Sequence, residues 1–214
     1  MLELPADEVI TSEDGLRARF RAPSELSLRK QLDHLDHNCR RFIALSPFLC
    51  LATTDKNGRL DNSPRGDAPG FVQVQDDRTL LIPDRPGNNR LDSLTNIVRN
   101  PQVGLLFFIP GVTEMLRVNG RARIVTRQDL LARFTVNNRA PAVAILVETQ
   151  EVFLHCSKAL IRSRLWQEDA KVNRKAALPS LGQMIAEVLD RQPAAATVAE
   201  YDARIDRNIK EELY

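Results

Sequence analysis

The sequence predicts a mainly β protein, built on a six-stranded antiparallel barrel with helices at both ends. Half a dozen short strand-like runs lie between residues 47 and 158, separated by turn signals about every ten residues. No regular crossover helices separate these runs, which excludes a doubly wound parallel sheet. The segments before and after them carry helical periodicity instead.

The N-terminal segment, residues 1–46, is expected to be a helical arm. Apolar residues recur at three- to four-residue steps and would share one face of a helix, which Ser24 caps and Pro47 ends. For residues 1–22 a frayed arm is the alternative. The apolar face consists of Leu28, Leu32, Leu35, Cys39 and Phe42.

The barrel domain is expected to span residues 47–166. Asn57-Gly58 suits the positive φ angles of a tight hairpin turn, and Gly120 marks a bulge inside a strand. Short helices are expected at 90–98 and at 126–134, the second opened by a capping box from Thr126 to Asp129. The expected strands are 48–54, 60–66, 71–75, 79–83, 103–109 and 115–125, with 142–156 forming a strand pair or one long strand.

Residues 167–214 are expected to form C-terminal helices that pack on the same domain. A second capping box, Thr197 to Glu200, would open the last helix. An apolar stripe in the preceding helix consists of Leu181, Ile185, Val188 and Leu189.

Composition narrows the class of protein. The chain has 214 residues, of which 43% are hydrophobic and 27% charged, which excludes disordered, collagen-like and disulfide-stapled chains. A formal net charge of +2 gives no indication of a nucleic-acid partner. Three cysteines, an odd number, read as reduced thiols. With no run of about 18 apolar residues and no signal-like start, we expect a cytoplasmic protein without membrane contact.

Three polar stretches are candidates for chemistry. In the first, a strand ending at Pro83 leads through a glycine turn to Asn88, Asn89, Arg90 and a helix start, which suits a phosphate. Spacing alone favours the alternative of an asparagine-capped helix with a solvated arginine. In the second stretch, Arg65 and Asp67 either clamp an anion or form a surface ion pair, and the sequence favours neither interpretation over the other.

The third stretch is cationic and contains the only tryptophan. Lys158, Arg162 and Trp166 step at four-residue intervals, which would align them on a helix to cover an anionic aromatic cofactor. A lone tryptophan is more often a core or interface anchor. We expect no metal site, because His34, His37 and Cys39 do not share one face. The arginines from 117 to 123 read as a solvated face rather than a nucleic-acid platform.

In order along the chain, these segments resemble the pyridoxamine 5'-phosphate oxidase-like flavoproteins with the split β-barrel fold. The resemblance runs from about Pro47 to Trp166, and its closing part resembles a subgroup described as FMN-dependent. It rests on Phe48–Thr54, Ser63–Asp67, Pro69–Val72, Arg78–Arg85, Gly87–Arg90, Asn100–Phe107, Leu116–Gly120 and His155–Trp166.

The resemblance implies a homodimer that binds FMN in grooves at the dimer interface. Residues matching Arg65, Gly66 and Asp67 would line the flavin edge, and Ile82 and Pro83 would touch the ring through backbone groups. Asn88, Asn89 and Arg90 would hold the phosphate. The segment with Lys158, Arg162, Ser163 and Trp166 would come from the partner chain.

The implied function is that of an FMN-dependent oxidoreductase acting on an unidentified small molecule, with NAD(P)H as a candidate electron donor. Backbone N–H groups near Ile82 to Asp84, or nearby cations, would stabilise the reduced flavin; no general acid or base is identified. Histidine occurs only at 34, 37 and 155, so the C-terminal substrate grip of the vitamin B6 oxidases is missing. A flavin carrier or sensor without turnover, or a deazaflavin- or heme-binding relative, is the alternative.

Overall fold

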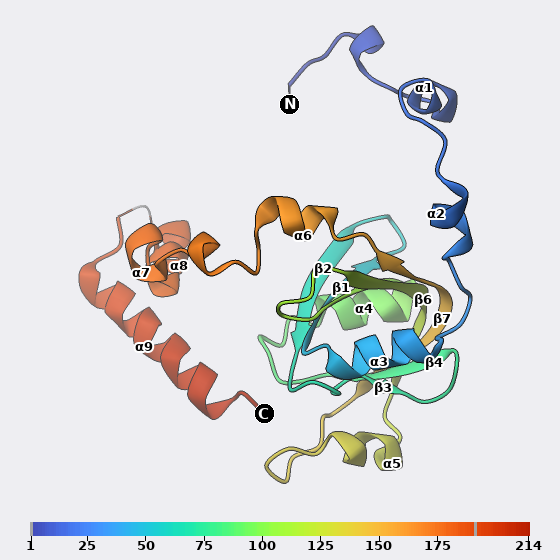
Figure 1. The fold of residues 1–214 in the computed structure, drawn as a ribbon. Helices are drawn as coiled ribbons and strands as arrows, with labels where there is room; N and C mark the ends of the chain where they lie inside the picture. The colour runs from blue at the N-terminus through green and yellow to red at the C-terminus, as the bar shows by residue number, and fades with distance from the viewer. Residues whose placement is uncertain (1, 191) are drawn as a thin grey trace.

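The computed structural model describes residues 2–190 and 192–214, and one antiparallel sheet forms its centre (Figure 1). The strand order is β2-β1-β5-β6-β7-β4-β3. The predicted fold class is confirmed, with seven strands rather than six: the run expected at 71–75 is a two-residue strand at the sheet edge, and 142–156 contains one long strand. The strands are β1 (Phe48–Thr54), β2 (Leu60–Gly66), β3 (Gln73–Val74), β4 (Thr79–Pro83), β5 (Gln102–Phe108), β6 (Met115–Val125) and β7 (Ala144–His155).

Helices precede, interrupt and follow the sheet. Among the residues described, none of them is long and apolar enough to cross a membrane. They are η1 (Ala6–Glu8), α1 (Glu13–Arg17), α2 (Glu25–Arg29), α3 (His37–Leu45), α4 (Asp92–Arg99), α5 (Gln128–Leu131), η2 (Ala132–Phe134), α6 (Lys158–Ser163), η3 (Glu168–Ala170), α7 (Arg174–Ala177), α8 (Leu181–Leu189) and α9 (Ala195–Glu211).

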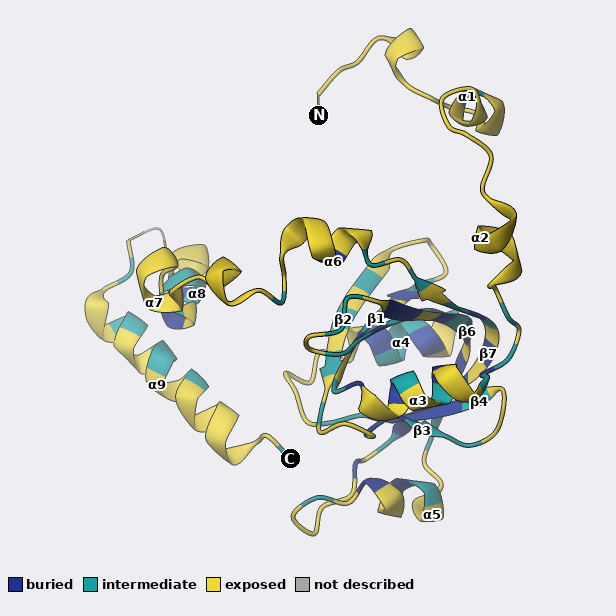
Figure 2. Ribbon diagram, viewed as in Figure 1, coloured by how far each residue is buried: buried dark blue, intermediate teal, exposed yellow. Residues whose placement is uncertain are grey.

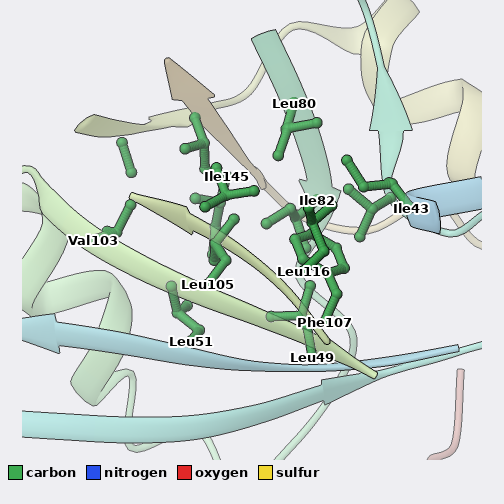
Figure 3. Close-up of a cluster of buried hydrophobic side chains, with 14 of the residues drawn as sticks. Ile43, Leu49, Leu51, Leu80, Ile82, Val103, Leu105, Phe107, Leu116 and Ile145 are labelled. Atoms are coloured by element: carbon green, nitrogen blue, oxygen red, sulfur yellow. The ribbon is translucent and has the colours of Figure 1, made fainter. Parts of the chain in front are cut away.

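The core lies inside the curled sheet (Figure 3). Strands β1 and β4 are not hydrogen-bonded neighbours, yet Leu49 of β1 and Ile82 of β4 belong to the same buried cluster. The two halves of the sheet therefore face each other across shared apolar side chains, as in a barrel. Fully buried members include Leu51, Leu80, Leu105, Phe107, Leu116 and Ile145.

The N-terminal arm is not the single helix that the spacing predicts. Ser24 caps α2 as expected, but the chain leaves the helix after Arg29. Leu32 then exchanges two backbone hydrogen bonds of 2.9 Å with Val152 of β7. Asp36 starts α3 by accepting a hydrogen bond from a backbone N–H of the first turn. This tertiary pairing overrides the helical period, and Leu28 stays 60% exposed.

Gly120 occupies the predicted bulge. The pairing of β6 with β7 shifts register between Asn119 and Gly120. A Cβ atom built on Gly120 would lie 2.1 Å from the carbonyl oxygen of Glu148. The close approach of the two backbones at this bulge therefore requires glycine.

Neither predicted capping box forms. Arg127, not Thr126, precedes α5, and its side chain pairs with Asp129 instead of capping the helix. Helix α9 begins at Ala195, so Thr197 lies inside its first turn. In both cases the helix starts near the predicted position without the predicted hydrogen bond.

The C-terminal helices α8 and α9 pack on each other beside the barrel (Figures 1 and 2). The predicted stripe on α8 is not the buried face, since Val188 is 85% exposed and the buried residues are Gly182 and Ala186. The backbone N–H of Gly182 donates to a carboxylate oxygen of Asp202 on α9 at 2.8 Å. Small residues are buried here because the two helices approach closely.

The three cysteines differ in burial, and we expect them to differ in reactivity. Burial, aided by the nearby Asp36 carboxylate, raises the pKa of Cys39 to about 12, whereas Cys156 is exposed. A disulfide reagent such as DTNB at neutral pH should modify Cys156 rapidly and Cys39 only after unfolding. Mass spectrometry of the labelled protein would identify the sites. Early labelling of Cys39 in folded protein would contradict this burial.

Candidate functional site

An open cleft of about 910 Å³ lies where β2, the loop after β4 and the start of α4 meet. The connection between η2 and β7 forms another wall, and Tyr214 from beyond α9 forms the last. The lining residues are Asp61–Gly66, Phe71, Pro83–Leu94, Arg139–Val143 and Tyr214.

Two ion pairs join β2 to the loop after β4 beside this cleft. Arg65 donates from Nη1 to Asp84 Oδ1 at 2.6 Å, and Arg85 donates from Nε to Asp67 Oδ2 at 2.6 Å. Strands β2 and β4 do not pair with each other through the backbone. We call these two ion pairs the seam, because they link β2 to the loop after β4, where no backbone hydrogen bonds join the two strands.

Arg65 keeps unused hydrogen-bonding capacity at the cleft. Its Nε is buried and has no partner among the described residues. A guanidinium group carries five N–H donors in a planar fork, which suits the oxygens of phosphate or carboxylate. An orphaned guanidinium donor beside a cleft therefore fits an anionic ligand.

The loop before α4 contradicts the alternative of an asparagine-capped helix. Leu91 precedes the helix in the left-handed region, with φ 59°, and no side chain caps the first turn. The side-chain oxygen of Asn88 accepts from the backbone N–H of Arg90 at 3.1 Å instead. The start of α4 therefore presents uncapped N–H groups and the positive end of a helix dipole to the cleft.

Arg90 itself is solvated in part, as that alternative supposed. Its side chain is 71% exposed and donates from Nε to Asp92 at 2.7 Å. This hydrogen bond raises the pKa of Arg90, so its charge is held at any working pH. The residue stands at the mouth of the cleft, next to the uncapped helix start.

Asp67 is the most heavily bonded carboxylate of the seam. Oδ1 accepts from the backbone N–H of Ala68 at 2.7 Å and from the Tyr214 hydroxyl at 2.9 Å, while Arg85 occupies Oδ2. Burial raises the pKa of Asp67, but these hydrogen bonds outweigh it and hold the pKa below its ordinary value. The same contact raises the pKa of Tyr214.

The cleft brings together half of the predicted flavin-site residues: Arg65, Gly66, Pro83, Asn88, Asn89 and Arg90. Asp67 lies at its edge through the Tyr214 hydrogen bond, whereas the side chain of Ile82 is fully buried in the core. The expected backbone donors are not available at two positions. Pro83 has no N–H, and that of Asp84 donates to Val143 at 3.1 Å. Cations, not these amides, face the cleft.

The other predicted residues, Lys158, Arg162, Ser163 and Trp166, do not line the cleft of their own chain. The predicted alignment of Lys158, Arg162 and Trp166 on one helix is wrong, because α6 ends at Ser163 and Arg164 turns left-handed with φ 55°. Trp166 lies beyond the helix and donates from Nε1 to the carbonyl oxygen of Val112 at 2.8 Å. Lys158, Arg162 and Ser163 are exposed.

Sequence reasoning missed Arg85, Asp84 and Tyr214. The first two stand inside the stretch already singled out, so their position beside Arg90 was a usable signal. Tyr214 is 147 residues from Asp67, and no feature of the sequence near it indicated a role in the site. In residues 2–190 and 192–214 no group of three or more histidine, cysteine or acidic side chains is placed to hold a metal ion.

Comparison with known proteins gives a family. The model of the family described as "Pyridoxamine 5'-phosphate oxidase" matches residues 35–156, more than half of the 214-residue chain. Among curated proteins, no sequence matches.

Three solved structures are similar to part of this chain. HupZ from Group A Streptococcus is 16% identical, with a TM-score of 0.46, 56% of this chain covered and 92% of that one. An FMN-binding protein from Syntrophomonas wolfei is 10% identical, with a TM-score of 0.43, 55% of this chain covered and 83% of that one. General Stress Protein 26 from Bacillus anthracis is 17% identical, with a TM-score of 0.42, 53% of this chain covered and 88% of that one. On the match to the family model, the chain belongs to the pyridoxamine 5'-phosphate oxidase family, a flavin-binding family.

Proposed function

We propose that the protein is a homodimeric FMN-dependent oxidoreductase that acts on a small molecule, and that FMN binds in the cleft beside the seam. The observation that carries the proposal is the convergence of two anion-binding features on one cleft. These are the orphaned buried Nε of Arg65 and the uncapped start of α4. A volume of about 910 Å³ suits a cofactor-sized ligand.

The phosphate would bind at the start of α4. The first-turn N–H groups offer hydrogen bonds there, and Arg90 adds charge when its guanidinium leaves Asp92 for the phosphate. Arg65 would hold a second anionic or carbonyl oxygen through its free donors. When bound, FMN supplies hydride and electron transfer between a donor and an acceptor, and the chain supplies position and positive charge.

A second copy of the chain would complete the site. On the outward face, Phe48, Cys50 and Ala52 of β1 lie on neighbouring strands with Leu106 and Phe108 of β5, and the rings of Phe48 and Phe108 lie 6.1 Å apart. Phe48 pairs with Gly66 of β2, next to Arg65, so a partner on this face would lie beside the cleft. We propose that the partner's α6 segment, with Lys158, Arg162, Ser163 and Trp166, covers the flavin from there.

Arg90→Ala tests the phosphate site. We expect FMN affinity to fall at least about tenfold, because a charge-assisted phosphate contact is lost. Titration of apoprotein with FMN, followed by flavin fluorescence, would measure this affinity; FAD and a deazaflavin would be titrated in the same way, and heme by its absorbance. Arg127→Ala is the matched control, since Arg127 pairs with Asp129 at the same spacing and is 69% exposed, yet lies outside the cleft. Equal affinities of the two variants, or failure of the wild type to bind FMN, would overturn the proposal.

Turnover separates an enzyme from a flavin carrier. The FMN-loaded protein would be mixed anaerobically with NADH or NADPH, and bleaching of the flavin absorbance would be followed. The alcohol and amine forms of vitamin B6 would be tried as alternative electron donors, and quinones and nitro compounds would then be added as acceptors. An enzyme reoxidises repeatedly with at least one of them. A protein that binds FMN and is never reduced and reoxidised catalytically is a carrier or sensor.

A further inference from the structure

Tyr214 joins three segments that are distant in the sequence. Its hydroxyl donates to Asp67 at the end of β2, and its ring lies 5.4 Å from the guanidinium carbon of Arg85. Its carbonyl oxygen accepts from Arg139, in the connection to β7, at 3.3 Å. One side chain thus ties the C-terminal helices to both partners of a seam ion pair.

Little else holds this end of the chain against the barrel. No residue of α9 is buried, and its principal packing is on α8. A second hollow, of about 370 Å³, lies between the end of α9 and the turn at Asn137 and Arg139. Because so few buried contacts support it, this segment is expected to open locally at low cost in free energy. The contacts of Tyr214 with Asp67, Arg85 and Arg139 then restrain its closed position.

The cleft keeps its volume with Tyr214 in the closed position. Tyr214 is one of the residues that enclose the space of about 910 Å³. That space remains within the range of ligand sites, so the tyrosine acts as a wall and does not fill the site. A side chain that encloses a site without filling it slows exchange of the ligand, because entry and departure pass through the same opening.

We propose that Tyr214 is a latch: its hydrogen bond to Asp67 holds the C-terminal segment closed along the cleft and slows release of the ligand bound there. This rests on the proposed function for the identity of the ligand, FMN, but not for the latch itself. The segment opens when the tyrosine leaves Asp67, and the ligand exchanges in the open state. Arg85 keeps Asp67 ionised and supports the ring, so it sets the acceptor in place.

Tyr214→Phe and Tyr214→Ala separate the hydroxyl from the ring. Stopped-flow release of FMN from loaded protein should be about tenfold faster in the alanine variant, with the phenylalanine variant in between. Tyr201→Ala is the matched control, because Tyr201 lies on α9, the helix that leads to Tyr214, with its ring 5.1 Å from the guanidinium carbon of Arg204 and outside the cleft. An unchanged release rate in Tyr214→Ala would overturn the latch. So would tighter FMN binding in that variant, which would make the tyrosine an inhibitor.

A second measurement needs no flavin. Hydrogen exchange of the backbone from 205 to 214 should be faster in Tyr214→Phe than in wild type, and unchanged in Tyr201→Phe. If the wild type binds no FMN but Tyr214→Phe loosens this segment, the proposed function fails and the latch stands. If FMN binds and neither release nor exchange responds to Tyr214, the latch fails and the proposed function stands.

Discussion

Replacing Gly120 with alanine should lower the free energy of unfolding by about 3 kcal/mol or more, the largest effect we expect from a single methyl group. The added Cβ would lie 2.1 Å from the carbonyl oxygen of Glu148 and 3.2 Å from the Cα of Thr149. Both are backbone atoms of β7, so no side-chain rotation relieves the clash. Strands β6 and β7 must separate at the bulge, which breaks the longest ladder of the sheet.

Urea unfolding, followed by circular dichroism, would measure the change. Gly104→Ala is the control, because Gly104 lies on the neighbouring strand β5. Its Cβ would meet only the side-chain oxygen of Asn119 at 3.3 Å and the Cβ of Ala52 at 3.8 Å. That variant should change stability by less than about 1 kcal/mol. Equal losses at the two positions would show that the bulge does not require glycine.

Replacing Arg85 with alanine should cost about 3 kcal/mol, the second large effect. The Arg85 side chain is 17% exposed and bonds the carboxylate of Asp67, which is 5% exposed, and the carbonyl oxygen of Phe134. Loss of the Arg85 side chain leaves the nearly buried carboxylate of Asp67 without its cationic partner. It also removes the guanidinium group that lies against the Tyr214 ring.

A double-mutant cycle with Asp67→Asn isolates the pair, because the asparagine leaves no buried charge to strand. Urea unfolding of the four proteins gives the coupling energy, which should be at least about 1 kcal/mol. Additive losses of unfolding free energy would show that Arg85 and Asp67 do not interact.

The pH dependence of stability is a second test of this ion pair. The folded pKa of Asp67 is depressed, so its contribution is present at neutral pH and is lost as the pH falls through that depressed pKa. Without Arg85 this loss on the acid side should be smaller.

Local sequence patterns were enough for the sheet and for the bulge. An apolar run predicted β1, the turn at Asn57-Gly58 predicted β2 as the returning strand, and alternation predicted β6, each at its observed bounds. The bulge at Gly120 was recognisable because a glycine inside a strand often marks a bulge or a close approach of two backbones. The Ser24 cap was equally local, since it joins atoms three residues apart.

The strands, the bulge, the family and the loop from Asn88 to Arg90 were predictable without a structure, because each depends on residues close together in the chain. The break of the arm at Leu32 and the contact of Tyr214 with Asp67 were not predictable from local patterns, because their partners, Val152 and Asp67, are far away in the sequence. Those outcomes depend on which distant groups compete for one donor or acceptor. A period or a spacing carries no record of that competition, since it describes neighbours along the chain and not partners across the barrel.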